Sequence, residues 1–426
     1  PAGGSIDDET PRFDPRPNTA RHPMPDPDPT TKLPLSNVTV VELGNLIAGP
    51  FTGLMLGDLG ADVIKIERPG TGDMIRQSGD SGEAIFTAFN RNKRSVKIDL
   101  QSDAGRAAYR ELVSEADIVI ENLRPGVVDR LGIGYDALTE DRDDLIYVSI
   151  AGFLQGGTYE DRPGMDVVGQ AMSGMMRMTG HEGEKPLRAG TSVVDIGTGV
   201  YGAFGAMTAL WMRETTGRGQ KVDAGLFETA SHWTNYWTIF AQLFGDHPPL
   251  GSSHPAFGLY DVFETDPDEW LFVGVITERQ WPAFCEAIDA PGLLADDRFE
   301  TNEKRQQHDE LLYELVQDRL RGRDRSAVIE SLLAGGVPSA PINQPSDLVE
   351  DPHLSELDLL VDTESGNETV QTMLTPLMGS EMTVSQRHHP PALGEDTAEV
   401  FESMGMTDRY EELNDAGAFS EDRSDE

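Results

Sequence analysis

Two carboxylates in the middle of the chain have the surroundings of catalytic groups. Asp195 is the single acid in the small-residue segment "TSVVDIGTGVYGAFGAMTALWM" (191–212), although the chain contains 74 Asp and Glu residues, and Asp166 opens "DVVGQAMSGMMRM". Either residue is well placed as the N-cap of the helix that follows it. A carboxylate fixed at a helix N-terminus is also held ionised and oriented, as a nucleophile must be. The local sequence therefore leaves both roles open.

Several basic residues follow predicted strands or lie near their ends. A surface ion pair explains any single one of them, but open α/β sheets bind their ligands at strand ends. The whole group therefore predicts a site for a polyanion in an otherwise acidic chain. Its members are Arg68, Arg91, Lys93, Arg94, Arg124 and Arg130.

The first predicted strand–helix unit resembles a nucleotide-binding turn only in part. Gly44 follows a strand, Gly49 precedes a helix, and Glu67 ends the next strand 23 residues after Gly44. However, "GNLIAG" lacks the middle glycine of a dinucleotide fingerprint and is followed by Pro-Phe rather than by the Lys-Ser/Thr of a Walker A loop. An NAD-dependent dehydrogenase is therefore disfavoured. The backbone amides at 47–49 can still meet a phosphate or an adenine.

Neither a metal site nor a serine hydrolase is indicated. The nine histidines show no metal-ligand spacing apart from the adjacent pair His388–His389, which lies in the loop-like "RHHPPALG". Ser173 and Ser192 lack the G-x-S-x-G elbow. We expect no bound metal.

Alternating strands and helices position these residues. Strand-like segments at 38–44, 62–67, 117–123 and 144–150 alternate with helical segments at 51–61 and 103–116. This alternation predicts an α/β fold with a parallel, doubly wound, Rossmann-like sheet. Composition changes then predict five regions. They are a disordered arm rich in Pro and Asp (1–32), a large Rossmann-like domain (33–230), a smaller α+β domain with linkers (231–345), a return to the large domain (346–415) and an acidic tail (416–426).

The composition favours a soluble protein of a reducing, salty cytoplasm. There is no signal-like apolar segment near the start, no uncharged apolar stretch of about 18 residues, and a single cysteine, Cys285, which excludes an intramolecular disulfide. The formal net charge is −40. Self-repulsion of that size destabilises a fold in dilute buffer, so we expect a halophilic source, with an acidic mesophilic protein as the alternative. Nucleic acid and anionic membranes are not expected partners.

A series of ordered sequence blocks resembles the family III CoA-transferases, the formyl-CoA and carnitine CoA-transferase group. The blocks extend from about residue 35 to 403 and include "VVELGNLIAGPFTGLMLGDLGADVIKIERPGTGD", "FNRNKRSVKIDL", "ADIVIENLRPGVVDRLGIGYDAL", "RPGMDVVGQAMSGMMRMTG" and "LGEDTAEVF". The resemblance implies a homodimer of two interlocked rings, with CoA as a cosubstrate and no permanently bound cofactor. It assigns the nucleophile to Asp195. CoA contacts carry over to Ile47, Ala48, Arg68, Lys93, Asn122, Leu123 and Arg130.

The chain departs from the family pattern in three places. The α-methylacyl-CoA racemases of the family have a base histidine immediately before the aspartate of "GxDxxxQ", where this chain has Met165. A two-base proton exchange then lacks one partner, so a transferase is favoured over a racemase. The other departures are "GFLQGGTY" (152–159) and "LGSSHPAFG" (250–258), the latter where formyl-CoA transferase has a run of glycines. A catalytically silent CoA-binding protein is a further alternative, which the presence of Asp195 disfavours.

The implied chemistry is a ping-pong transfer through acyl-aspartyl anhydrides and an aspartyl-CoA thioester, with Asp166 in an accessory role. For the substrates we expect succinyl-CoA as donor and a C4 or C5 dicarboxylate such as mesaconate as acceptor, by analogy within the family. A dicarboxylate needs a second anchor for its distal carboxylate. The candidates are Arg188, Arg177 and His254.

Overall fold

A six-stranded parallel sheet with the strand order β3-β2-β1-β4-β5-β6 forms the centre of the large domain in a computed structural model, which describes residues 33–140 and 142–420. All five neighbouring pairs are parallel. This is the strand order of dinucleotide-binding folds, and it confirms the predicted Rossmann-like sheet. The strands are β1 (Thr39–Leu43), β2 (Asp62–Glu67), β3 (Lys93–Lys97), β4 (Ile118–Glu121), β5 (Ile146–Ala151) and β6 (Lys221–Gly225).

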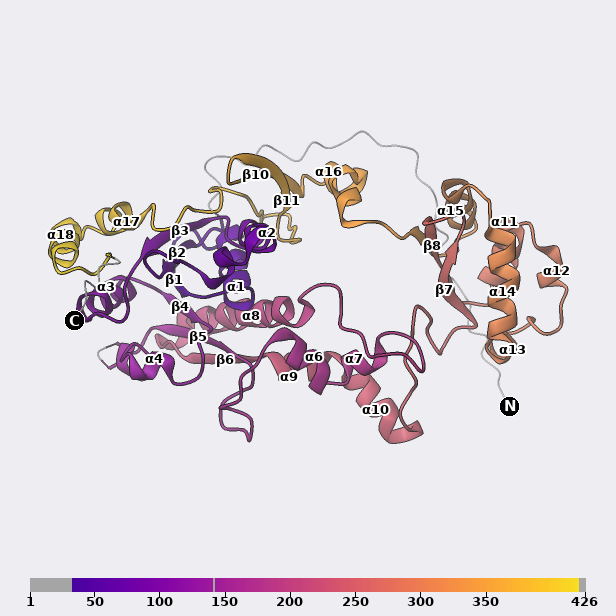
Figure 1. Cartoon of the computed structure of the whole chain (residues 1–426), viewed down its shortest axis with the longest axis horizontal. Helices are drawn as coiled ribbons and strands as arrows, with labels where there is room; N and C mark the ends of the chain where they lie inside the picture. Colours follow the sequence, from indigo (N-terminus) through magenta and orange to yellow (C-terminus); the bar gives the residue numbers. More distant parts are fainter. Residues whose placement is uncertain (1–32, 141, 421–426) are drawn as a thin grey trace, which may run out of the picture.

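Helices cover both faces of this sheet (Figure 1), which explains why the central strands β1, β4 and β5 bury apolar side chains on both faces. The outer strands β3 and β6 carry several charged residues. Val41 and Val119 point into the core on one face, Val40 and Ile120 into the core on the other, and none of the four is exposed. One face is covered by α1 (Ala48–Asp58), α8 (Val193–Thr216) and α9 (Leu226–Trp233), and the other by α3 (Asp103–Ser114), α17 (Thr397–Ser403) and α18 (Thr407–Asp415). The remaining helices of the first 245 residues are η1 (Met74–Gln77), α2 (Gly79–Phe89), α4 (Val127–Arg130), α5 (Tyr135–Leu138), α6 (Asp166–Met172), α7 (Met175–Met178) and α10 (Asn235–Phe244).

The smaller domain has its own hydrophobic core, which extends from Leu259 to Val337. Three antiparallel strands, β7 (Leu259–Glu264), β8 (Trp270–Val275) and β9 (Ser339–Pro341), pack with α11 (Gln280–Ala287), α12 (Pro291–Leu294), α13 (Asn302–Gln307), α14 (Asp309–Leu320) and α15 (Arg325–Ala334). This core lies inside the region expected for the small domain and its linkers, 231–345. Helix α9, which ends at Trp233, packs against α6 and α8 and therefore belongs to the large domain.

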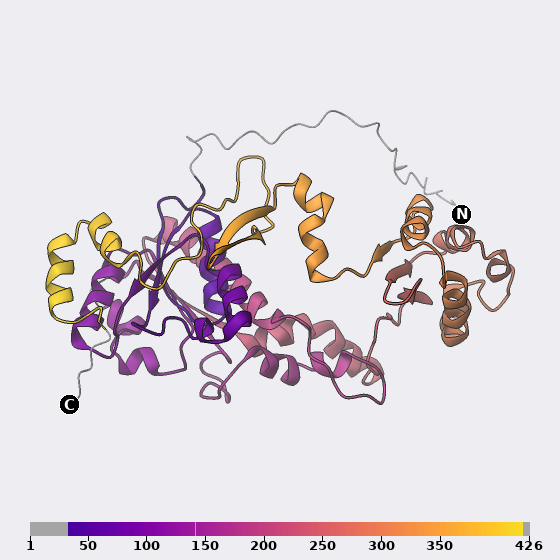
Figure 2. The same ribbon diagram turned by 45° about the horizontal axis from the view of Figure 1, so that its top comes forward.

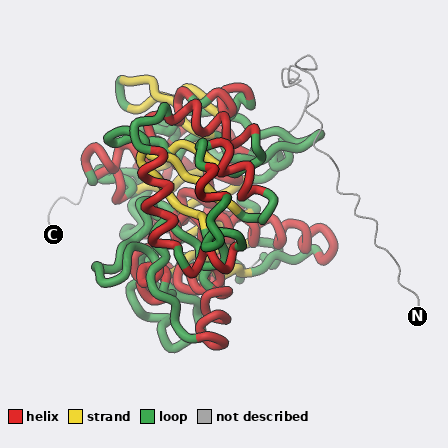
Figure 3. The backbone as a smooth tube through the Cα atoms, turned by 90° about the vertical axis from the view of Figure 1, so that its right-hand side faces the viewer, coloured by secondary structure: helices red, strands yellow, loops and turns green. Residues whose placement is uncertain are grey.

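The chain forms an open ring. It leaves the large domain through α10 and returns through η2 (Pro345–Glu350), α16 (Pro352–Glu356) and the hairpin of β10 (Leu360–Ser365) and β11 (Glu368–Met373). Figures 1 and 2 both show these as two separate connections between the lobes, and in Figure 3 helices surround the strands. Buried Asp58 of α1 joins the returning segment to the large domain. It pairs with Arg91 at 2.5 Å and accepts hydrogen bonds from the Thr375 N–H and hydroxyl at 3.0 and 2.8 Å.

The C-terminal end differs from the acidic tail expected from residue 416. Ala418 and Phe419 are buried, and the Phe419 ring lies 5.2 Å from that of Tyr410 and 5.5 Å from that of Phe401. Burial of these apolar groups is favourable because it removes their surface from water. The expected arm at 1–32 and the acidic residues 421–426 lie outside the described residues.

Helix α8 is, by length and composition alone, apolar enough to cross a membrane, and within the described residues it is the one helix that meets this test. In this fold it packs against α1, β5 and β6. A central helix of a water-soluble α/β domain meets the same criterion.

Candidate active site

Asp195 lies in the first turn of α8, but it is not the cap of that helix. Ser192 occupies the N-cap position and makes no side-chain cap bond. Asp166 supplies the bonds instead: its Oδ1 accepts hydrogen bonds from the N–H groups of Val194 at 2.7 Å and of Asp195 at 3.2 Å. Asp166 is likewise not the cap of α6, of which it is the first residue after Met165. The expected caps were therefore wrong in position, because Asp166 crosses to a helix that begins 27 residues later in the chain.

The Asp166 carboxylate is buried and held from its other side. Gln170, one turn further along α6, donates from Nε2 to Asp166 Oδ2 at 2.5 Å, and its Oε1 accepts from the Ala189 N–H at 2.9 Å. Asp166 is 6% exposed and Gln170 is not exposed. Gln170 thus fixes both Asp166 and the segment that leads into α8. Sequence reasoning missed this role, although the i, i+4 spacing of Asp166 and Gln170 was a signal for it.

The electrostatics of this turn suit a nucleophile that works near neutral pH. Burial of the carboxyl group, with the negative charge of Asp166 as the second cause, raises the pKa of Asp195 to about 7. A more basic carboxylate is a stronger nucleophile, provided that enough of it is ionised. At neutral pH both conditions are met in Asp195.

Close packing of α8 on α1 brings Asp195 near the loop after β1. A Cβ atom on Gly199 would lie 2.9 Å from the carbonyl oxygen of Ala48, so only glycine allows this approach. Thr52 bonds the two helices by donating to Gly199 O at 3.0 Å and to Ala48 O at 3.1 Å. Asp195 precedes Gly199 by about one helical turn. The Asp195 end of α8 therefore faces the start of α1.

The loop that enters α1 is held by side chains from two other segments. Asn122 accepts from the Asn45 N–H and donates to the Asn45 carbonyl, both at 2.8 Å, and Asp73 Oδ1 accepts from the Leu46 N–H at 3.0 Å. Both Asn122 side-chain groups are therefore engaged. The Leu123 N–H is engaged as well, because it donates to Glu121 Oε2 at 3.0 Å, so it does not offer the free donor to CoA that was expected of it. The first-turn N–H groups of α1, which starts at Ala48 after Ile47, have no intrahelical partner.

The predicted polyanion site divides into two groups. Arg68, Arg124 and Arg130 are exposed beyond the carboxyl ends of β2 and β4, and within the described residues they form no ion pair. Arg91, Lys93 and Arg94 are instead bound to Asp58, Glu42 and Asp62 respectively. Arg91 precedes β3, and Lys93 and Arg94 begin it, so all three lie at the amino end of this strand. The prediction that they lie at the ligand-binding end of a strand was therefore wrong.

Lys93 is the member of the second group that the resemblance connects with CoA. Its ammonium is buried, donates to Pro50 O at 2.8 Å and to Asn90 Oδ1 at 2.9 Å, and pairs with Glu42 Oε2 at 2.7 Å. Its three donors are thereby occupied. Burial also lowers the pKa of this ammonium to about 8, with Glu42 opposing the effect. A direct contact between Lys93 and a phosphate is therefore not supported.

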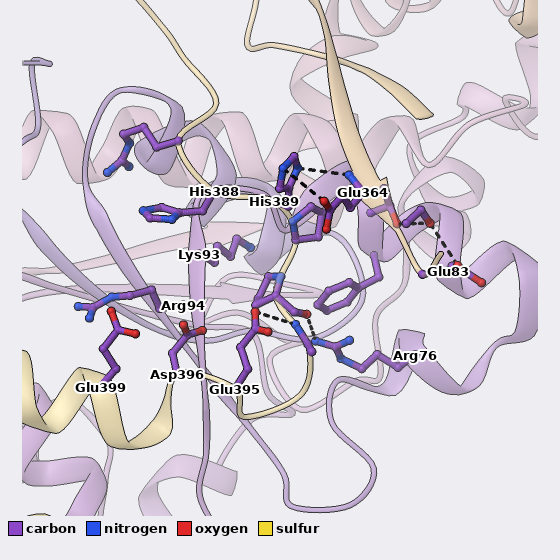
Figure 4. Close-up of a pocket in the computed structure, with 18 residues that line it drawn as sticks. Arg76, Glu83, Lys93, Arg94, Glu364, His388, His389, Glu395, Asp396 and Glu399 are labelled. Atoms are coloured by element: carbon purple, nitrogen blue, oxygen red, sulfur yellow. Dashed lines mark hydrogen bonds and ion pairs between the residues drawn. The ribbon is translucent and has the colours of Figure 1, made fainter. Parts of the chain in front are cut away.

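A large cavity lies at the β3 edge, away from Asp195. It measures about 780 Å³ and is enclosed by α2, the β10–β11 turn and residues 387–399 (Figure 4). Of the basic residues expected to bind a polyanion, Lys93 and Arg94 line it. Arg76 in its wall forms an ion pair with Glu67 at 2.8 Å, and Arg94 is paired with Asp62. These two cations are thus already paired, and the lining does not include Asp195, so this cavity is not the candidate active site.

The candidates for a substrate carboxylate lie on two segments. Arg188 is exposed and adjoins Ala189, which Gln170 ties to Asp166. Arg177, also exposed, lines a second cavity of about 800 Å³ together with Trp237. The ring of His254 lies 6.3 Å from that of Trp237. Arg188 is therefore tied to the Asp195 turn through the chain, whereas Arg177 and His254 share the surroundings of Trp237.

Comparison with known proteins agrees with this geometry. The sequence profile described as CoA-transferase family III matches residues 35–397. A succinate–glutarate CoA-transferase of Agrobacterium fabrum is 34% identical and covers 89% of this chain and 98% of its own, and a succinyl-CoA:mesaconate CoA-transferase of Haloarcula hispanica is 33% identical, with 87% and 96% covered. The crystal structure of a CAIB/BAIF family protein from Brucella suis superposes with a TM-score of 0.81 at 33% identity and covers 88% of this chain and all of that one. The chain belongs to CoA-transferase family III and is an enzyme of the CoA-transferase type.

Proposed function

We propose that this enzyme moves CoA from an acyl-CoA thioester to a carboxylic acid, with Asp195 as the nucleophile. The observation that carries the proposal is the setting of Asp195. Its carboxyl is partly buried, its pKa is about 7, and its helix is capped by Asp166 next to the start of α1. A carboxylate attacks a thioester when it is shielded from water and the thioester is held against it.

The first half of the reaction loads the enzyme. A carboxylate oxygen of Asp195 attacks the thioester carbonyl, the C–S bond breaks, and an acyl-aspartyl anhydride and CoA thiolate form. The thiolate then attacks the aspartyl carbonyl of the anhydride, which releases the donor acid as its carboxylate and leaves an aspartyl-CoA thioester. The first-turn amides of α1 are suited to stabilise the oxyanions of these steps.

The second half reverses this order with the acceptor. The acceptor carboxylate attacks the aspartyl-CoA thioester, CoA thiolate leaves, and a second anhydride forms. Attack of the thiolate on the acceptor acyl carbon gives the new acyl-CoA and restores the Asp195 carboxylate. Water must be kept out, because it would hydrolyse either anhydride.

For CoA we propose anchoring by the unpaired arginines and the nearby backbone. Arg68, Arg124 and Arg130 offer charge to the phosphates, and the amides of Ile47 and Ala48 offer donors. The Leu123 amide offers none while it donates to Glu121. Lys93 takes a supporting role beneath this loop because its ammonium is occupied. Arg91 and Arg94 take no part for the same reason.

For the substrates we propose succinyl-CoA as donor and a C4 or C5 dicarboxylate such as mesaconate as acceptor. Support comes from the relatives, whose names join succinyl-CoA or succinate to mesaconate or glutarate. A distal carboxylate needs a cationic anchor. Arg188 is the first choice because Gln170 links its segment to Asp166, and Arg177 and His254 are the alternatives.

We further propose that two chains assemble as interlocked rings in a salty cytoplasm. The open ring of each chain provides the shape, and α8 and α10 carry large exposed apolar side chains, including Trp211 at 75% and Phe244 at 73% exposure. Such groups on a soluble domain are typical of an interface. The net charge of −40 supports the high-salt setting.

The test is chromatography of CoA esters after the enzyme is mixed with succinyl-CoA and a panel of carboxylic acids in molar KCl. A new acyl-CoA that forms with wild type and is lost with Asp195→Ala supports the proposal and identifies the acceptor. Asp408→Asn, an exposed acid in the first turn of α18, is the matched control and should retain full activity. Deuterium exchange at the α-carbon of a branched acyl-CoA, with no transfer to any acid, would instead indicate a racemase.

A further inference from the structure

Four charged side chains lie in a row inside the large domain, beneath the loop that joins β1 to α1. Lys93 Nζ lies 2.7 Å from Glu42 Oε2, Glu42 Oε1 lies 3.0 Å from Lys65 Nζ, and Lys65 Nζ lies 2.9 Å from Asp73 Oδ2. None of the four residues is more than 2% exposed. Buried ion pairs seldom stabilise a fold more than apolar side chains of the same volume would. This buried charge row therefore needs another explanation.

The row holds the backbone of the loop above it at three atoms. Lys93 donates to the carbonyl oxygen of Pro50 at 2.8 Å, and Lys65 donates to that of Gly44 at 2.8 Å. Asp73 Oδ1 accepts from the Leu46 N–H at 3.0 Å. Burial alone would lower the pKa of the Lys65 ammonium, but the carboxylates of Glu42 and Asp73 raise it above its usual range, so Lys65 stays charged. The loop is thus fixed by charged partners that are held in place by ion pairs.

Leu46 is the strained residue of this loop. Its φ is +65°, whereas the other non-glycine residues with positive φ in the described chain are asparagine or aspartate. The left-handed region costs an aliphatic residue about 1–2 kcal/mol, while Asn and Asp tolerate it. Such a conformation persists where surrounding bonds impose it. At Leu46 the bond is the one to Asp73.

We propose that Asp73 is a positioning residue for acyl-CoA binding: with the buried charge row behind it, Asp73 holds Leu46 in the left-handed conformation and so aims the amides of Ile47 and Ala48 at the ligand. The inference rests on the proposed function, in which these amides meet CoA. Asp73 itself does not reach the ligand, because its side chain is fully buried.

The first test measures CoA binding by titration calorimetry, which is independent of turnover. Asp73→Ala should raise the Kd for CoA about tenfold, the loss expected when one well-placed bond no longer orders the loop. Its KM for acyl-CoA should rise in parallel, while its KM for the acceptor acid stays within about twofold. Asp73 accepts two backbone N–H bonds, from Leu46 and from Ile75, each at 3.0 Å. Asp351→Ala is the matched control, since Asp351 likewise accepts two, from His353 at 2.9 Å and Leu354 at 3.0 Å, but in α16.

A second pair of variants separates positioning from general stability. Leu46→Asn in the Asp73→Ala background should recover most of the lost affinity, because asparagine adopts the left-handed conformation without the clamp. Leu46→Val should weaken CoA binding about tenfold with the buried charge row intact, because a β-branched residue resists positive φ. Leu46 is 39% exposed and Leu46→Val keeps Asp73, so this variant leaves the fold undisturbed and tests the inference even if Asp73→Ala does not fold.

The outcomes are distinct. Unchanged CoA affinity in Asp73→Ala and Leu46→Val would overturn the inference, and so would a loss in Asp73→Ala that Leu46→Asn does not repair, since Asp73 would then act through packing alone. A wild-type enzyme that neither binds CoA nor forms a new acyl-CoA would contradict the proposed function itself.

Discussion

The carboxylate of Asp166 accepts a hydrogen bond from the backbone N–H of Asp195 at 3.2 Å and a shorter one, of 2.7 Å, from Val194. One acid thereby caps the helix that carries the other. The contact has two effects on Asp195. It fixes the first turn of α8, and it places a second negative charge near the Asp195 carboxyl, which adds to burial in raising its pKa. Asp166 therefore fixes the position of the candidate nucleophile and adds to its basicity, which burial raises most.

Asp195→Asn should change the pH dependence of stability. The pKa of Asp195 is raised in the folded state to about 7, so its stabilising contribution is present at low pH and is lost as pH rises from about 4 to 7. The neutral amide has no such loss. The variant should therefore gain about 2 kcal/mol of unfolding free energy relative to wild type between pH 5 and pH 8, measured by urea unfolding. A gain that is the same at both values would mean that Asp195 titrates normally, and Asp408→Asn should show no pH-dependent gain.

The pH dependence of wild-type activity should report the titration of the same group, the Asp195 carboxyl. The ionised carboxylate is the reactive form, so kcat/KM for acyl-CoA should rise with pH through about 7 and then level off. Asp166→Asn removes the neighbouring charge and keeps an acceptor for the capping bonds, so the midpoint should fall by about half a unit to one unit. Its new amide faces the Gln170 donor, which should cost about 1 kcal/mol of stability. A midpoint that stays in place would show that Asp166 acts only as a cap.

Replacing an exposed arginine that has no ion pair should affect the KM for acyl-CoA, whereas replacing a paired arginine should affect stability. Arg68→Gln and Arg130→Gln should each raise the KM for acyl-CoA about threefold to tenfold, because each loses one phosphate contact. The effect should shrink as KCl is increased. Arg94→Gln is the matched comparison: Arg94 is paired with Asp62, so this variant should lose stability and keep its KM. Equal effects on KM in all three would contradict the division between free and paired cations.

The sequence predicted the parallel sheet because four strand-like segments alternate with helical ones such as α3. It did not predict β3 and β6, whose charged residues hide the strand pattern. Asp195 stood out as the single acid of the segment 191–212, and the resemblance to the CoA-transferases assigned it the role of nucleophile, which stays a prediction. What the sequence did not predict about the site depends on contacts between distant segments. Nothing local in "NKRS" shows that Lys93 pairs with Glu42, 51 positions earlier in the chain.

The caps illustrate the same limit. An N-cap is expected from the residue just before a helix, and Ser192 has the right side chain but makes no such bond. The acceptor comes from Asp166, which only the packing of α6 against α8 brings into place. The prediction of an acidic tail from residue 416 was wrong at its start for a related reason. Charged residues dominate the sequence of 416–426, but Ala418 and Phe419 are buried in the core of the large domain.

Salt should stabilise this protein strongly. With a net charge of −40, repulsion between surface carboxylates opposes folding, and it is screened when the Debye length falls from about 10 Å at 0.1 M to about 3 Å at 1 M. Buried pairs such as Lys65–Glu42 lie beyond the reach of that screening, so the effect must come from the surface. The Tm should rise by about 10 °C or more between 0.1 and 2 M KCl, followed by circular dichroism. Sucrose at equal osmolality is the control for solvent exclusion, and a flat Tm in KCl would mean that the acidic surface is tolerated without a salty medium.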